Sequence, residues 1–161
     1  MRPRHIRSLV PDPVKHDNMK YSLTESLKAH DKWVELLTEK MKEAEYVEFN
    51  TLYDYSNLLP ELEDLKSELV EEGRRKDKIY PSGKYRRYKL TSKLKDFILS
   101  KKYDSWANYQ FEDLSLIKNE KEILATITHE NYIYIMTTDE ERKEFNKRGF
   151  DFGELFELKN E

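Results

Sequence analysis

The residues of this chain with the clearest chemical potential are the cations between positions 74 and 95. This stretch holds ten Lys and Arg residues against one carboxylate, Asp77, a local net charge of +9 in a chain whose total is −3. Such a block attracts phosphates or acidic protein surfaces, although a merely solvated hairpin face is the alternative interpretation. The candidate nucleic-acid contacts are Arg74, Arg75, Lys76, Lys78, Lys84, Tyr85, Arg86, Arg87 and Lys89. Tyr85 belongs to this set because strand alternation predicts that its ring is exposed and free to stack on a base.

A second candidate site combines a histidine with carboxylates at the ends of two predicted strands. His129 and Glu130 follow one strand, and Glu112 and Asp113 begin another, so a β-meander would bring the two pairs together. Side chains of this kind suit acid–base catalysis or a divalent cation. The resulting hypothesis is a metal-dependent hydrolase at Asp113, His129 and Glu130, and turn formation by these polar residues is the competing interpretation.

Several other kinds of chemistry are excluded by residue types that are absent or wrongly spaced. The chain has no cysteine, and its four glycines are too dispersed to form a phosphate-binding loop. The four histidines also lack the spacing of a zinc enzyme. We therefore expect a protein that is not an enzyme, with no catalytic residues, no bound metal and no cofactor.

Length and composition predict a folded protein. The 161 residues suffice for one domain or two small ones, and the aromatic set of eleven Tyr, seven Phe and two Trp argues against disorder. No apolar run is long enough to cross a membrane, and the amino terminus does not resemble a secretory signal. We expect a cytoplasmic protein with no membrane partner.

A long helix is predicted over residues 23–46, after a flexible basic arm over residues 1–20. Ser22 and Glu25 form a capping-box pattern at the start of this helix. Its apolar stripe recurs at spacings of four and three and comprises Leu23, Leu27, His30, Val34, Leu37, Met41 and Ala44. The stripe fits a homodimer through helix 23–46 and also fits packing within its own domain, with His30 in the core or interface.

The middle of the chain is predicted to contain helices and a hairpin. In order, these are a short helix or turn over residues 49–57, an acidic helix over residues 60–72, strands over residues 76–80 and 84–90, and a helix capped by Thr91 or Ser92. Pro60 suits the first turn of the acidic helix, and Gly73 suits its C-terminal end. The basic hairpin would therefore hang between two helices.

The last third of the chain is predicted to be an antiparallel meander followed by a helix. Its strands span residues 111–117, 122–128 and 132–137, and Thr138 with Glu141 begins a helix that ends near Gly149. The chain thus divides into the arm, residues 21–102 and residues 103–161, with the last two parts packed either separately or as one unit. The fold class is α+β.

The order of elements over residues 31–100 resembles the winged helix-turn-helix superfamily. The segment LEDLKSELVEEGRRKDKIYPSGKYRRYKLTSKLKDFIL carries this resemblance, with a third helix ending in Glu-Gly, a wing, and a Tyr-x-Leu-Thr closing strand. The resemblance implies a winged-helix-like half whose wing is the basic hairpin. It also implies a third helix in the DNA major groove, but residues 60–72 are acidic and would repel phosphates.

The leading hypothesis is accordingly a small regulatory or binding protein that contacts the nucleic-acid backbone through its basic wing. Such contacts position a protein on nucleic acid without reading its bases. The first alternative is a protein-interaction module, an adaptor or inhibitor, that uses the acidic helix 60–72; the partner would be a basic protein for this helix or an acidic one for the wing. The second alternative is the metal-dependent hydrolase at the meander.

Overall fold

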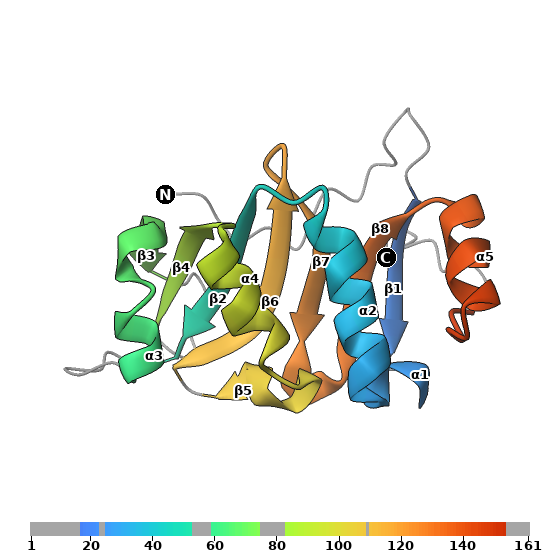
Figure 1. The fold of residues 1–161 in the computed structure, drawn as a ribbon, viewed down its shortest axis with the longest axis horizontal. Coiled ribbons are helices and arrows are strands. Elements are labelled where there is room, and N and C mark those ends of the chain that lie inside the picture. The colour runs from blue at the N-terminus through green and yellow to red at the C-terminus, as the bar shows by residue number, and fades with distance from the viewer. Residues whose placement is uncertain (1–16, 23–24, 53–58, 75–82, 109, 154–161) are drawn as a thin grey trace.

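The computed structural model of the chain describes residues 17–22, 25–52, 59–74, 83–108 and 110–153. The fold is α+β, with helices packed against an antiparallel sheet (Figure 1). The strands are β1 (Asp17–Ser22), β2 (Tyr46–Thr51), β3 (Leu69–Arg74), β4 (Lys84–Lys89), β5 (Ala107–Asn108), β6 (Phe111–Lys118), β7 (Lys121–Ile127) and β8 (Tyr132–Thr137). The α-helices are α1 (Glu25–Lys28), α2 (His30–Met41), α3 (Pro60–Glu63), α4 (Ser92–Leu99) and α5 (Asp139–Lys147), and the short 3-10 helices are η1 (Lys66–Glu68), η2 (Tyr103–Trp106) and η3 (Thr128–Glu130).

The sheet contains strands from both halves of the chain. Its order is β1-β8-β7-β6-β2-β4-β3, and the short β5 pairs with β6. Strand β2 joins the halves because it pairs with β4 on one side and with β6 on the other. Residues before and after position 103 therefore lie in one continuous sheet.

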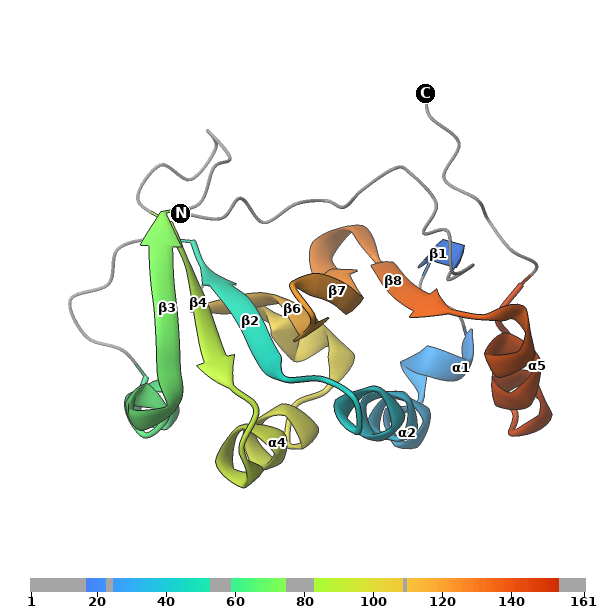
Figure 2. The same cartoon turned by 90° about the horizontal axis from the view of Figure 1, so that it is seen from above.

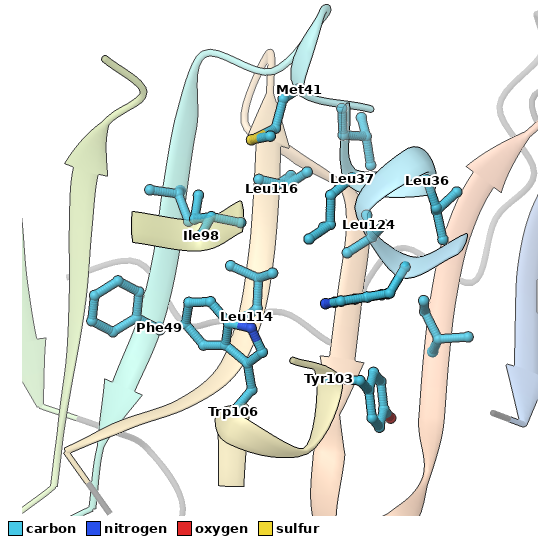
Figure 3. Close-up of a cluster of buried hydrophobic side chains, with 14 of the residues drawn as sticks. Leu36, Leu37, Met41, Phe49, Ile98, Tyr103, Trp106, Leu114, Leu116 and Leu124 are labelled. Carbon is cyan, nitrogen blue, oxygen red and sulfur yellow. The ribbon is translucent and has the colours of Figure 1, made fainter. Parts of the chain in front are cut away.

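The hydrophobic core lies between the sheet and the helices α2 and α4, which cover one of its faces (Figure 2). Trp33 and Leu37 of α2 and Ile98 of α4 are fully buried there. Figure 3 shows Leu37 and Ile98 in one cluster with the strand residues Phe49 and Leu114. Burial of this apolar surface is the main stabilising contribution to such a fold.

The opposite face of the sheet carries polar side chains. Alternation along β2 directs Val47 and Phe49 toward the helices, so Glu48 and Asn50 point to the other face. Both of these polar residues are nevertheless buried. The same alternation along β4 places Tyr88 in the core and Tyr85 and Arg87 on the polar face.

The predicted meander and its flanking helix are confirmed. Strands β6, β7 and β8 pair in sequence, and the turn between β6 and β7 uses Asn119 and Glu120, both with positive φ. Paired left-handed residues are typical of a tight hairpin whose twist matches its strands. Thr138 caps α5 by accepting a hydrogen bond from the amide of Glu141 at 3.1 Å. In the same way, the Thr91 side chain caps α4 by accepting a hydrogen bond from the amide of Leu94.

The long helix predicted over residues 23–46 is wrong in its extent. The helical segment is divided into α1 and α2 near Ala29 and ends at Met41, because Tyr46 already belongs to β2. The apolar side chains predicted at a dimer seam, including Leu27, Leu37 and Met41, are buried in the chain's own core. His30 is exposed, so the prediction that it lies in the core is wrong, and a place in an interface between chains stays a prediction.

The prediction for residues 49–57 is also wrong where the structure describes them, and the helix predicted over residues 60–72 is confirmed only at its start, as α3. The first segment begins inside β2, a central strand of the sheet. The acidic helix ends at Glu63, and residues 69–74 form β3 instead. Pairing with β4 places Glu72 opposite Arg86 and Glu71 opposite Arg87, and these contacts override local helix propensity.

A winged-helix arrangement is not shown by the structure. The basic hairpin exists, and its first described strand is β3; the strand predicted over residues 76–80 lies outside the described residues. The second hairpin strand is β4, as predicted. The flexible arm predicted over residues 1–20 is wrong for residues 17–20, which belong to β1. Residues 1–16 lie outside the described part.

Gly73 lies within strand β3 and does not end a helix. It is directly opposite Tyr85 in the register, and a Cβ atom at position 73 would lie 2.6 Å from the Tyr85 ring. The glycine thus allows the buried ring to pack against the backbone of β3.

Within the described residues, no helix combines the length and apolar character needed to span a membrane.

Candidate functional site

The two central arginines of the basic hairpin are buried and paired with carboxylates. Arg87 contacts Glu48 at 3.0 Å and Glu120 at 3.2 Å, and a third carboxylate, Glu71, lies 3.8 Å away. Arg86 contacts Glu72 at 2.8 Å and also donates a hydrogen bond to Thr51. Neither guanidinium presents a free charge to a phosphate backbone.

Tyr85 is buried, contrary to the prediction that its ring is exposed. Only 4% of the residue is accessible, and its hydroxyl donates a hydrogen bond to Glu71 at 3.0 Å. Burial, followed by the nearby charge and hydrogen bond of Glu71, raises the pKa of Tyr85 above its usual value. The prediction fails because it treats the outward face of β4 as solvent, whereas the Tyr85 ring packs against Gly73 and its hydroxyl bonds to Glu71.

The remaining predicted nucleic-acid contacts fall into two groups. Arg74 and Lys89 are exposed, and Lys84 is half-buried and lies 3.5 Å from Glu72. Arg74 and Lys84 are opposite each other in the β3–β4 register. The other members, Arg75, Lys76 and Lys78, lie outside the described residues.

The second candidate site is found at the start of β6, where the strand has a bulge. Glu48 pairs with Ser115 and Asn50 pairs with Glu112, so β6 has one residue more than β2 between these pairs. Asp113 sits in this bulge with a φ of 57°. In a regular strand, neighbouring side chains point to opposite faces, but a bulge redirects a side chain and often occurs near a functional site.

A short helical turn after β7 brings a histidine to these carboxylates. Asp113 Oδ1 accepts a hydrogen bond from the backbone amide of Thr128 at 3.0 Å, which ties η3 to the bulge. His129 Nδ1 lies 2.9 Å from Glu112 Oε1. One ligand atom from each of Glu112, Asp113 and His129 lies within 4.8 Å of the other two. We call these three residues the acid–histidine cluster.

The acid–histidine cluster is accessible from one side. Glu112 and Asp113 are buried, whereas 58% of the His129 side chain is exposed. Tyr103 lies in the hydrophobic core, where it packs against Trp33, and it donates a hydrogen bond to the Tyr132 carbonyl at 3.1 Å. Burial, with smaller contributions from the charges of Asp113 and Asp104, raises the pKa of Tyr103, so its hydroxyl stays neutral.

Asn50 adds a further polar group next to the cluster. It is directly opposite Glu112 in the β2–β6 register, so their side chains share the polar face of the sheet. Asn50 is 3% exposed, and its Oδ1 accepts no hydrogen bond from any residue that the structure describes. An unsatisfied buried acceptor is unusual and costs stability.

The structure thus brings together part of the set predicted for the meander. Glu112, Asp113 and His129 meet, whereas Glu130 lies outside the group of ligand atoms. Carboxylate oxygen and imidazole nitrogen are ligands of divalent metal ions. Sequence reasoning missed Asn50, because only strand pairing reveals that it lies beside Glu112.

Comparison of the chain with protein-family models, with curated proteins and with solved structures gives no match.

Proposed function

We propose that this protein binds a divalent cation through Glu112, Asp113 and His129. The observation that supports the proposal is the convergence of three ligand atoms within 4.8 Å, from two segments that a bulge and a 3-10 turn hold together. The exposed imidazole leaves a route for an ion to enter. This part of the chain is the strongest candidate for function among the residues described.

Hydrolysis is the reaction class that such a centre would serve. A divalent ion held by three protein ligands keeps positions for water and lowers the pKa of that water toward neutrality. The proposed site retains Asp113 and His129 from the predicted hydrolase and replaces Glu130 with Glu112. Activity against simple phosphate and carboxylate esters, with and without added metal, tests this extension.

Thermal unfolding with and without MnCl2 or ZnCl2 tests cation binding. An ion at a hundred times its Kd adds about 2.7 kcal/mol of stability, a rise in melting temperature of roughly 5–10 °C for a chain of this size. His129→Ala should abolish most of the rise, because the exposed ring contributes a ligand but little packing.

His30→Ala is the matched control, since His30 is also an exposed histidine and lies on α2, outside the cluster. This variant should keep the full rise in melting temperature. The proposal is wrong if neither ion stabilises the parent protein, or if His129→Ala and His30→Ala respond alike.

A second proposed function is backbone contact with nucleic acid at the end of the basic hairpin. The observation that favours it is the register pair Arg74 and Lys84, two cations directly opposite each other. Arg74 is exposed and Lys84 is half-buried with Glu72 at 3.5 Å, so a phosphate at this end of the hairpin would lie within reach of both cations. The buried and paired Arg86 and Arg87 contribute no contacts in this version.

Binding of random duplex DNA at about 50 mM salt tests this second function, since phosphate contacts are strongest at low salt. The double variant Arg74→Ala with Lys84→Ala should weaken binding several-fold, whereas Lys66→Ala, an exposed lysine on η1, should not. Absence of binding by the parent protein would rule this function out.

A further inference from the structure

We infer that Asn50 is the fourth protein ligand of the proposed cation site, and that its amide oxygen adapts the site to an oxygen-preferring, six-coordinate ion of the Mn²⁺ class. This inference rests on the proposed function, because it concerns the same centre. It goes further by adding a residue from another strand and by naming the class of ion.

The position of Asn50 supports this role. Directly opposite residues of an antiparallel pair have Cβ atoms about 4.5–5.5 Å apart, so the Asn50 side chain lies next to that of Glu112. Both residues are buried on the polar face of the sheet. A cation held by Glu112 would therefore lie within reach of the Asn50 amide.

The hydrogen bonding of Asn50 supports the same role independently. Its Oδ1 accepts no hydrogen bond within the part of the chain that is described. The two other such buried atoms are indole nitrogens, Trp33 Nε1 and Trp106 Nε1, which are donors in the aromatic core. Asn50 Oδ1 is an acceptor beside metal-ligating side chains, and a cation would satisfy it.

The resulting set of donors determines the class of ion. Glu112, Asp113 and Asn50 supply three oxygens, and His129 supplies one nitrogen. Carboxylate and amide oxygens suit Mg²⁺, Ca²⁺ and Mn²⁺, whereas the usual zinc ligands are thiolate, imidazole and carboxylate. Loss of the amide should therefore affect Mn²⁺ more than Zn²⁺, which the other three residues and a water can still hold.

Isothermal titration of the full chain with MnCl2 and with ZnCl2 tests the inference on matched variants. Asn50→Leu should weaken Mn²⁺ binding by roughly tenfold or more, in the range seen when residues that support a metal site are lost. Zn²⁺ binding should change by less than about threefold, since its three main ligands remain. Asn50→Asp, which keeps the oxygen and adds charge, should bind Mn²⁺ at least as tightly as the parent.

Ser115→Ala is the control, because Ser115 is a buried polar residue on the same strand as Glu112 and is not part of the cluster. Its Mn²⁺ affinity should match that of the parent. The inference is overturned if Asn50→Leu binds Mn²⁺ as tightly as the parent, or if Mn²⁺ and Zn²⁺ weaken equally. If the parent protein binds neither ion, the proposed function itself fails, which is a distinct outcome.

Discussion

The charged side chains of the β3–β4 hairpin and those of the acid–histidine cluster have different kinds of neighbours. In the hairpin, strand pairing places Arg86 and Arg87 beside carboxylates of the neighbouring strands, with one register shift in β3 between Leu69 and Glu71. In the cluster, a bulge and a 3-10 turn bring together Glu112, Asp113 and His129, whose side chains can all bind a metal ion. The difference is one of sign: cations of the hairpin meet carboxylates and are neutralised, whereas the cluster gathers two carboxylates and an imidazole that could bind the same cation.

The largest expected effect comes from breaking the buried ion pair of the hairpin. Arg87→Leu leaves the 3% exposed Glu48 without its guanidinium partner, which typically costs about 3–5 kcal/mol. Urea denaturation measures the change in the free energy of unfolding. If Arg87 were instead a binding residue on the surface, the loss would be small.

Two further variants sharpen this result. Glu48→Leu combined with Arg87→Leu should recover most of the lost stability, because neither charge of this buried pair remains. Lys89→Ala, the exposed neighbour on β4, should change the free energy of unfolding by less than about 0.5 kcal/mol.

The next largest effect concerns the irregular backbone of the cluster. Asp113→Ala removes the acceptor for the buried Thr128 amide and puts an alanine at a φ of 57°, so we expect a loss of roughly 2–3 kcal/mol. Asp113→Asn keeps both an acceptor and a residue that tolerates this φ, and should lose less than about 1 kcal/mol. Denaturation in the presence of a chelator separates this effect from metal binding, and equal losses in the two variants would contradict the explanation.

A smaller effect is expected where β3 and β4 approach most closely. Gly73→Ala places a Cβ atom against the Tyr85 ring and should cost about 1–3 kcal/mol, as overpacking of a filled site usually does. Gly153→Ala is the control, because no atom lies within 4 Å of its added Cβ. Melting temperatures that fall equally in both variants would show that the ring contact is unimportant.

The smallest effect is the pH dependence of the pair formed by Glu72 and Arg86. Burial alone would raise the pKa of Glu72, but the hydrogen bond and charge of Arg86, with the charge of Lys84, hold it below its usual value of 4.5. The stabilisation is therefore present above pH 4.5 and is lost as the pH falls through the lowered pKa.

Glu72→Gln removes this contribution, so the stability difference from the parent should be present at pH 7 and shrink at acidic pH. Because a third of the side chain is exposed, the difference should stay below about 1 kcal/mol. Urea denaturation at both pH values measures it, and a difference that grows on acidification would be inconsistent with the ion pair.

The elements that were predicted well are those specified by nearby residues. Thr138 with Glu141 marks the start of α5, and the residues around Asn119 mark the tight turn of the meander. Their capping and turn contacts span only a few positions, so they can be read directly from the chain. The acid–histidine cluster follows in part from that meander, which was predicted with nearly the observed strand ends.

The elements that were predicted wrongly depend on distant partners. Residues 69–74 have acidic side chains typical of a helix surface, yet they form β3 because Glu71 and Glu72 meet Arg87 and Arg86 on β4. Residues 46–51 form a central strand because β4 and β6 flank them. Local propensity is weak compared with such pairing and burial.

By itself, the sequence determined the α+β class, the meander with its capped helix, and the strand alternation that separates core from polar face. Only the tertiary structure decided that Arg86 and Arg87 are neutralised and that Asn50 lies beside Glu112. The physical reason is that alternation specifies the face on which a side chain lies, whereas its cross-strand neighbours depend on which strands pair and in what register.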